Sequence, residues 1–283
     1  MNINWYPGHM KVSIDKIKKS LKMVDIVCEI VDARIPISSR NPLLDDIIGD
    51  FPRMIIFNKA DMANPEETKK WISYFQSKGI EVIEFNALED RKTKSIYDRA
   101  RKILDEMFTR RMSKGISSNE IRMMVVGIPN VGKSTFINNV SKRRGTKVGN
   151  RPGVTRINQW INTDSDLLLL DTPGVLWPKL DTPDKGMALA YTGAIKDDNL
   201  DIETLAFNLI EKLKDFPGQL IEGRYGVDQT LTSLEIMEQI GRKIGALLRA
   251  NEIDYNKVST TVLDDFRKMR LGRITLEKVE DIK

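Results

Sequence analysis

Thiols are almost missing from this sequence, whose 283 residues include one cysteine, Cys28. A single cysteine cannot form an internal disulfide, and zinc sites built from cysteine clusters are likewise excluded. Long apolar runs are also missing, because no stretch approaches the roughly 20 residues that a membrane-spanning helix needs. The start of the chain, Met1–Met10, lacks the basic and then apolar order of a signal peptide. These absences predict a protein of the reducing cytoplasm that does not enter a membrane.

Charge of one sign is not in large excess, with 45 basic and 40 acidic residues, but it is unevenly distributed. Three segments are locally basic, namely residues 1–22, 140–160 and 267–273. The second of them holds six basic residues and no acidic one. Such segments suit a polyanionic partner such as RNA, although an ordinary solvated surface has the same appearance in a sequence.

Short apolar runs alternate with amphipathic stretches over roughly the first 175 residues. The predicted strands are Ile26–Val31, Arg53–Phe57, Ile80–Phe85, Ile121–Val126, Ile157–Ile161 and Leu167–Leu170. The predicted helices between them include Pro65–Lys78, Lys92–Thr109 and Lys133–Ser141. This alternation favours an α/β fold with a mainly parallel sheet covered on both faces. The polar segment Arg110–Glu120 is interpreted as a linker.

Beyond about residue 180 the strand-like pattern ends and apolar residues recur at helical spacing. The predicted helices there are Gly186–Ile195, Ile202–Leu213, Ser233–Leu248 and Tyr255–Met269. One apolar stripe is assigned to a helix–helix core, and its members are Leu234, Met237, Ile240, Ile244 and Leu247. We therefore expect an α/β domain over residues 1–179 and a smaller all-α domain over residues 180–283.

A phosphate-binding loop is predicted at Gly127–Ser134, which fits the pattern G-x-x-x-x-G-K-[ST] between a predicted strand and a predicted helix. The glycines let backbone N–H groups curl around phosphate oxygens, and the helix N-terminus adds positive potential. Lys133 would bridge the β and γ phosphates, and the Ser134 hydroxyl would bind Mg²⁺. The residues predicted to contact nucleotide in this loop are Asn130, Val131, Gly132, Lys133, Ser134 and Thr135.

Two further segments complete the predicted phosphate and metal site. The apolar run Leu167–Leu170 ends in Asp171-Thr-Pro-Gly174, 38 residues after Lys133. The Asp171 carboxylate would hold Mg²⁺ through a water, and the Gly174 N–H would meet the γ-phosphate. Thr155, in a segment rich in turn formers, is the candidate for a second Mg²⁺ ligand on a switch loop.

A base-recognition site is predicted at Asn58-Lys59-Ala-Asp61, directly after an apolar strand. The Asp61 carboxylate would accept hydrogen bonds from N1–H and the N2 amine of guanine, and adenine offers neither donor there. Leaving that carboxylate without its partners costs roughly 2–4 kcal/mol. Asn58 would hold the loop, and the Lys59 stem would lie over the base. A second strand ends at Asn86-Ala87, where a backbone N–H would donate to guanine O6.

These motifs match those of the translation-factor-like GTPases but occur in permuted order, because the base motifs precede the phosphate loop. Circular permutation is tolerated when the original chain ends lie close together, and Arg110–Glu120 is the expected junction. The opening Trp5–Met10, with Asp32–Pro36 and Asn41-Pro42, resembles the ribosome biogenesis GTPase A family, also called YlqF. Later segments agree with that family's C-terminal domain, namely Arg224–Gly226, Asp264–Arg267 and Leu271–Glu277.

The resemblance implies a bacterial GTPase of late large-subunit (50S) assembly. Such a factor binds ribosomal RNA and ribosomal proteins of the precursor particle in its GTP state and leaves after hydrolysis. It is expected to be a cytoplasmic monomer that uses Mg²⁺ with GTP. Basic residues of the helical domain are the candidate RNA contacts, namely Lys243, Arg249, Lys257 and the cluster Arg267–Arg273.

Hydrolysis needs a group that positions the attacking water, and many GTPases place a glutamine soon after Asp-x-x-Gly. Here Val175, Leu176 and Trp177 follow, and none of them can serve. The resemblance assigns this role to His9, the only histidine in the chain. It also implies that Asn130 coordinates K⁺, which would add positive charge near the phosphates. An asparagine that merely forms a turn is the alternative.

Three other functions fit parts of the sequence. The first is a guanine-nucleotide-dependent RNA-binding switch with negligible turnover, which Val175 leaves open. A kinase that transfers phosphate from ATP to a metabolite is disfavoured by Asp61. A permuted GTPase of the small subunit would be expected to carry a cysteine–histidine metal cluster and an N-terminal all-β module, and this sequence has neither pattern.

Overall fold

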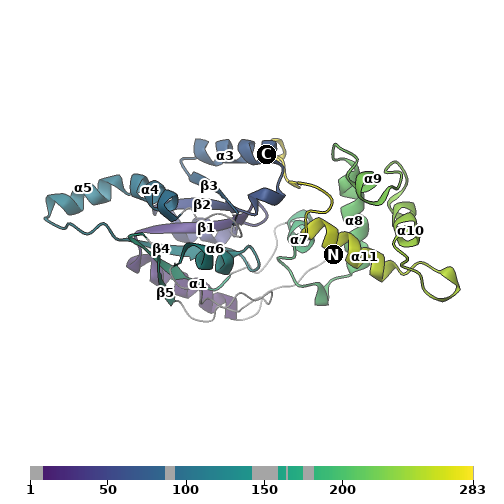
Figure 1. Cartoon of the computed structure of the whole chain (residues 1–283). Helices are drawn as coiled ribbons and strands as arrows, with labels where there is room; N and C mark the ends of the chain where they lie inside the picture. Colours follow the sequence, from purple (N-terminus) through teal and green to yellow (C-terminus); the bar gives the residue numbers. More distant parts are fainter. Residues whose placement is uncertain (1–8, 87–92, 142–158, 164, 175–181, 283) are drawn as a thin grey trace. The chain divides into compact units, whose positions relative to one another are not determined.

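A computed structural model describes residues 9–86, 93–141, 159–163, 165–174 and 182–282 (Figure 1). The chain divides into two compact units, described below through these residues only: unit 1 spans residues 1–183 and 275–283, and unit 2 spans Asp184–Ile274. None of the described helices is long and apolar enough to span a membrane.

Unit 1 is built on a six-stranded sheet with the strand order β3-β2-β1-β4-β6-β5. The strands are β1 Ile26–Asp32, β2 Arg53–Asn58, β3 Glu81–Phe85, β4 Ile121–Val126, β5 Gln159–Asn162 and β6 Leu167–Asp171. All neighbouring strands are parallel except β5 and β6, which are antiparallel. The prediction of a mainly parallel sheet is therefore confirmed. Every residue of β1 is buried, as expected for a central strand covered on both faces.

Helices lie on both faces of this sheet (Figure 1). In unit 1 they are α1 His9–Ser20, α2 Pro42–Ile48, α3 Pro65–Ser77, α4 Thr93–Ile103, α5 Asp105–Ser113 and α6 Lys133–Val140. Phe57 of β2 and Phe85 of β3 are one register position apart, so their side chains point to opposite faces. The Phe57 ring contacts Phe75 of α3, whereas the Phe85 ring contacts Phe136 of α6. α3 and α6 therefore cover opposite faces.

Three helical features of unit 1 differ from the sequence prediction. α1 and α2 were not predicted, and α2 begins where the Asn41 side chain accepts a hydrogen bond from the N–H of Leu43. The helix expected over Lys92–Thr109 is two helices, because Leu104 separates α4 from α5. α5 continues to Ser113, so the irregular part of the expected linker is confined to residues 114–120.

Unit 2 is helical, and its helices are α7 Pro183–Tyr191, α8 Ile202–Lys214, α9 Leu220–Tyr225, α10 Ser233–Lys243 and α11 Tyr255–Arg267. α8, α10 and α11 pack against one another. α10 starts with a capping box in which Thr232 and Glu235 each bond the other's backbone N–H. The predicted core stripe is partly wrong, because Leu234 is 49% exposed, and because Leu247, which is 41% exposed, lies beyond the end of α10 at Lys243. The residues that α10 buries are Ser233, Ile236, Met237, Ile240 and Gly241.

The end of the chain differs most from the expected domain division, which placed residues 180–283 in one helical domain. Residues 275–283, called the C-terminal tail below, belong to unit 1. Figure 1 shows the chain end beside α3. The Trp71 indole N–H of α3 donates to the Glu277 carbonyl at 3.0 Å, and Val279 packs against the buried cluster around Trp71. The tail returns because its apolar and hydrogen-bonding groups find partners on α3, a long-range event that helical periodicity does not reveal.

Candidate functional site

The phosphate loop follows β4 and ends at the first residue of α6, as the motif requires. Gly127 and Gly132 have positive φ angles of 151° and 101°. A side chain at Gly127 would place its Cβ 2.7 Å from the Ile30 carbonyl oxygen, and one at Gly132 would collide with the Asn58 amide. Both positions therefore need glycine for conformation and for space. The backbone of this loop is held close to the ends of β1 and β2.

Lys133 is folded back over its own loop. Its ammonium group donates to the carbonyls of Gly127 at 3.1 Å and of Ile128 at 3.0 Å. The residue is 8% exposed, and this burial lowers the pKa of Lys133 to about 8, against the opposing influence of Asp171. A buried cation at a helix N-terminus is a suitable partner for phosphate oxygens.

The Asp171–Gly174 segment lies directly against the phosphate loop. Asp171 ends β6 opposite Val125 of β4, and the Thr172 hydroxyl donates to the Val125 carbonyl at 2.7 Å. A Cβ on Gly174 would come within 2.9 Å of the Lys133 ammonium and 3.0 Å of the Pro129 nitrogen. Gly174 therefore lies so close to the loop that a larger residue would displace the Lys133 ammonium and crowd the Pro129 backbone.

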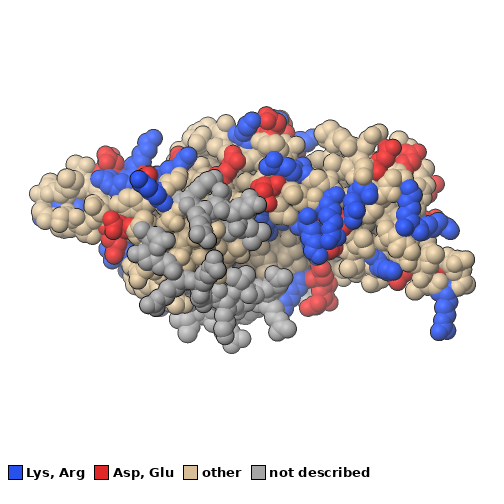
Figure 2. Space-filling view, in the orientation of Figure 1, with Lys and Arg blue, Asp and Glu red and all other residues tan. Residues whose placement is uncertain are grey.

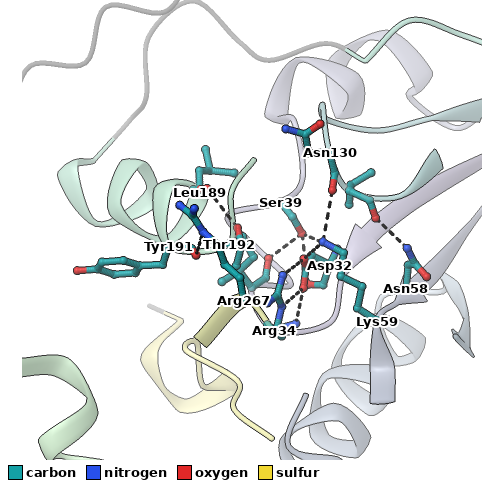
Figure 3. Close-up of polar contacts among 12 residues, drawn as sticks. Asp32, Arg34, Ser39, Asn58, Lys59, Asn130, Leu189, Tyr191, Thr192 and Arg267 are labelled. Atoms are coloured by element: carbon teal, nitrogen blue, oxygen red, sulfur yellow. Dashed lines mark hydrogen bonds and ion pairs between the residues drawn. The ribbon is translucent and has the colours of Figure 1, made fainter. Parts of the chain in front are cut away.

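The base motif is bonded to the phosphate loop at two points (Figure 3). The Asn58 amide, at the end of β2, donates to the Val131 carbonyl at 2.9 Å. The Lys59 ammonium lies 3.3 Å from the Asn130 carbonyl and 2.9 Å from an Asp32 carboxylate oxygen. These contacts join segments that are separated by more than 70 residues in the sequence. The two motifs therefore form one site, although their order along the chain is permuted.

Asp32 and Arg34 form the buried support of Lys59, as the dashed lines in Figure 3 show. The Arg34 guanidinium grips both Asp32 carboxylate oxygens, at 2.9 and 2.8 Å, and the Arg34 N–H adds a third bond at 3.1 Å. Burial opposes ionisation of Asp32, but the charges of Arg34 and Lys59 outweigh it and hold its pKa below the usual range. Sequence reasoning used these residues only as family markers. The signal for their role was an acid at the end of an apolar strand.

Most predicted site residues follow the carboxyl ends of parallel strands, which meet at one edge of the sheet. Asn58 follows from β2, Asn86 comes directly after β3, and the phosphate loop follows β4. Asp61 lies half-buried in the 3₁₀ turn Ala60–Met62, and Ser134 and Thr135 are half-buried in the first turn of α6. Ala87 and Thr155 lie outside the described residues. His9 begins α1, and its side chain is also outside the described part.

The donors at this edge fit a nucleotide with a divalent cation. Magnesium prefers hydroxyl, carboxylate and water oxygens, and Ser134 and Asp171 offer the first two types. The glycine positions that exclude a Cβ leave backbone close to the buried Lys133 ammonium, as a phosphate site needs.

Comparisons with known proteins agree with this chemistry. Residues 122–206 match the family described as 50S ribosome-binding GTPase. A Bacillus cereus protein named ribosome biogenesis GTPase A is 43% identical over 283 residues, covering 99% of this chain and 95% of that protein. A Bacillus licheniformis protein of the same name is 39% identical over 100% of both chains. The crystal structure of GNP-bound YlqF from Thermotoga maritima matches with a TM-score of 0.68 at 25% identity, covering 96% of this chain and 100% of that one.

Proposed function

Since the chain belongs to the ribosome biogenesis GTPase A (YlqF) family and is a GTP hydrolase of ribosome assembly, we propose that it acts late on the large subunit. In this proposal the GTP-bound protein binds the precursor particle, through its RNA and proteins, and leaves after hydrolysis. The protein acts as a monomer in the cytoplasm. A chain with one cysteine, which is buried and free, forms no internal disulfide, and this agrees with a reducing compartment.

The observation that carries the nucleotide-binding part of the proposal is the pair of contacts between the base motif and the phosphate loop. Asn58 donates to the Val131 carbonyl and Lys59 to the Asn130 carbonyl, so a shift of either motif would displace the other. A ligand that fills the site must therefore satisfy both at once, which favours a guanosine di- or triphosphate over a free base or a free phosphate.

The base end selects guanine through Asp61. Asn58 holds the loop, the Lys59 stem covers the base, and the backbone at Asn86 and Ala87 supplies the donor for guanine O6. Support comes from the left-handed conformation of Lys59, with φ of 58°, which turns the chain sharply between β2 and the Asp61 turn.

The phosphate end is formed by residues 130–135 and Gly174. Lys133 neutralises charge on the β and γ phosphates, and the Gly174 N–H responds to the presence of the terminal one. Ser134 and Thr155 are the direct Mg²⁺ ligands, and Asp171 acts through a water. The bound metal supplies charge stabilisation to the phosphates during hydrolysis. Asn130 is the ligand for K⁺. Equal turnover in KCl and NaCl would remove that assignment.

His9 is the residue that orients the attacking water. We expect His9→Ala to lower the subunit-stimulated turnover by about 100-fold, within the usual range for loss of a proton-handling or water-positioning group. GTP affinity should change less than about twofold, because no part of the base or phosphate site is removed. Equal losses in affinity and turnover would assign His9 a folding role.

The RNA-contacting residues are expected in unit 2. Exposed candidates are Lys243, Arg249, Lys257 and Arg273. Arg267 and Arg270 are less suitable, because Arg267 pairs with Asp197 and Arg270 pairs with Asp265. Figure 2 shows basic and acidic side chains interspersed on the visible surface, so contact with RNA would depend on single well-placed cations.

Co-sedimentation tests the proposed partner directly. The full chain is mixed with large ribosomal subunits, or with their precursors, in the presence of a non-hydrolysable GTP analogue, GDP or no nucleotide. The proposal expects stable co-sedimentation with the analogue and release with GDP. Equal binding in all three conditions, or binding to the small subunit only, would contradict it. A Lys133→Ala variant, which should not respond to the analogue, is the matched control.

A further inference from the structure

The C-terminal tail is fixed to unit 1 by a carboxylate that caps backbone donors. The two carboxylate oxygens of Glu277 accept hydrogen bonds from the N–H groups of Ile37, at 2.7 Å, and Ser38, at 3.0 Å. The Leu276 N–H donates to the Arg34 carbonyl at 2.8 Å. Charge-assisted bonds of this kind are about twice as strong as neutral ones. The tail therefore holds the segment between β1 and α2 at its backbone.

That segment, residues 33–41, is called the β1–α2 loop here. It carries Arg34, which grips the Asp32 carboxylate with three hydrogen bonds. The loop makes a second contact with the end of β1, where the Asp32 N–H donates to the Ser39 hydroxyl at 3.0 Å. A shift of this loop would displace Arg34 and, with it, the carboxylate that it orients.

Asp32 in turn fixes Lys59, whose ammonium group lies 2.9 Å from the carboxylate and 3.3 Å from the Asn130 carbonyl. The tail also touches the other side of the base motif, where the Thr275 hydroxyl accepts from the Asn64 N–H at 3.0 Å. Asn64 is three residues after Asp61. The tail thus holds both flanks of the segment that meets the base.

We infer that Glu277 is a positioning residue for guanine-nucleotide binding, because its carboxylate holds the β1–α2 loop in the conformation in which Arg34 and Asp32 orient Lys59. This inference rests on the proposed function, since it assigns the tail to the same nucleotide site. Glu277 itself touches no nucleotide in this scheme. Its effect reaches the site through backbone contacts and the two ion pairs that Asp32 forms with Arg34 and Lys59.

The test compares two tail glutamates in the full chain. Glu277→Ala removes the cap on the β1–α2 loop, whereas Glu280→Ala removes only the exposed contact with Lys70 on α3. Titration calorimetry with GDP should show about five- to tenfold weaker binding for Glu277→Ala, at the low end of ordinary coupling between sites. Glu280→Ala should stay within about twofold of the wild type. Equal affinities for the two variants would overturn the inference.

Kinetics separate positioning from general loss of structure. Glu277→Ala should raise the KM for GTP by a similar factor and leave kcat at saturating GTP unchanged. Glu277→Gln keeps one acceptor oxygen and should recover part of the lost affinity. If Glu277→Ala does not fold, the GDP affinity of Glu277→Gln tests the inference by itself. An affinity equal to that of the wild type would count against the inference, and a lower affinity would support it.

A double variant tests the route through Lys59. If Glu277 acts through this lysine, Glu277→Ala combined with Lys59→Ala should bind GDP no more weakly than Lys59→Ala alone. Additive losses would show that the tail acts elsewhere and would contradict the route. Failure of the proposed function would be seen in the wild-type protein itself, which would then show no analogue-dependent co-sedimentation with the large subunit or no preference for guanine nucleotides.

Discussion

Replacing Asp32 by asparagine removes one buried charge at the point where β1 ends. The Asp32 and Arg34 side chains are each 3% exposed, and Lys59 is 24% exposed. Asp32 accepts four hydrogen bonds, three from Arg34 and one from Lys59. Asparagine offers one acceptor oxygen, and its amide N–H₂ would face a cation. The variant therefore leaves two positive groups close together without the charge that holds them.

The expected loss follows from the burial of these partners. Removing one member of a buried ion pair costs roughly 3–5 kcal/mol, because the remaining charge is left desolvated. The asparagine oxygen retains part of the bonding to Arg34, and Lys59 has some access to water. We therefore expect the free energy of unfolding of unit 1 to fall by about 3 kcal/mol. Exposed Asp46, on α2, is the matched control, and Asp46→Asn should change stability by less than about 0.5 kcal/mol.

The effect should also depend on pH in a defined direction. Because the folded-state pKa of Asp32 is lowered, its contribution to stability is present above the unfolded pKa of about 3.9 and is lost as pH falls through the folded value. The difference between wild type and Asp32→Asn should therefore stay constant between about pH 5 and pH 8. It should shrink only in more acidic solution.

Urea denaturation followed by tryptophan fluorescence measures this loss in unit 1 alone. Of the four tryptophans, the two that the structure describes, Trp71 and Trp160, lie in unit 1, and no tryptophan falls within the residue range of unit 2. A change below about 1 kcal/mol for Asp32→Asn, or a change no larger than that of Asp46→Asn, would refute the assignment of Asp32 as a buried charge that holds Arg34 and Lys59.

Three further outcomes follow from the structure. Because burial lowers the pKa of Lys133 to about 8 and phosphate binds its charged form, GDP affinity should decline above about pH 8 by at most tenfold per pH unit. Lys133→Met should bind GDP weakly and should not show that decline. Gly174→Ala would place a Cβ against the Lys133 ammonium and the Pro129 backbone. GTP turnover should therefore fall by about tenfold or more while GDP still binds, and unchanged single-turnover kinetics would contradict this. Arg267→Ala removes the bonds to Asp197 and to the carbonyls of Ala190 and Tyr191. The free energy of unfolding of unit 2, measured by hydrogen exchange, should therefore fall by about 2–3 kcal/mol, while the tryptophan fluorescence of unit 1 stays unchanged. Lys268→Ala, which loses only an exposed pair with Asp264, is the control.

The fold was predictable to the extent that its signals are local. Each of the six strands in the described part of the chain overlaps a predicted one, with β5 at Gln159–Asn162 against the expected Ile157–Ile161. The segment Gly127–Ser134 lies between a strand and a helix, as its motif predicted. α1 was missed because it is largely polar, and α2 was missed because its seven residues are too few to show a helical period. The Asn41 cap of α2 was interpreted only as a family marker. The predicted core stripe was wrong at Leu234, which fits the helical spacing of the apolar residues but is exposed.

The sequence motifs predicted that the base motif and the phosphate loop would lie together, but not the contacts that support them. Asp32 and Lys59 are 27 residues apart, and Glu277 is about 240 residues from Ile37 and Ser38. No local pattern indicates such pairings, because they depend on the order of strands in the sheet and on the return of the tail to α3. Sequence periodicity describes each element separately, whereas these contacts arise only when the elements are assembled.

The central claim is that separated segments form one guanine-specific nucleotide site. Calorimetric titration of the wild type and Asp61→Asn with GDP, ADP and xanthosine diphosphate tests it most directly. The wild type should prefer GDP to ADP by at least about 30-fold, equivalent to roughly 2 kcal/mol. Asp61→Asn should shift this preference toward the xanthine nucleotide, whose 2-oxo group accepts from an amide. Equal affinity of the wild type for GDP and ADP, or an unchanged preference in Asp61→Asn, would contradict the account.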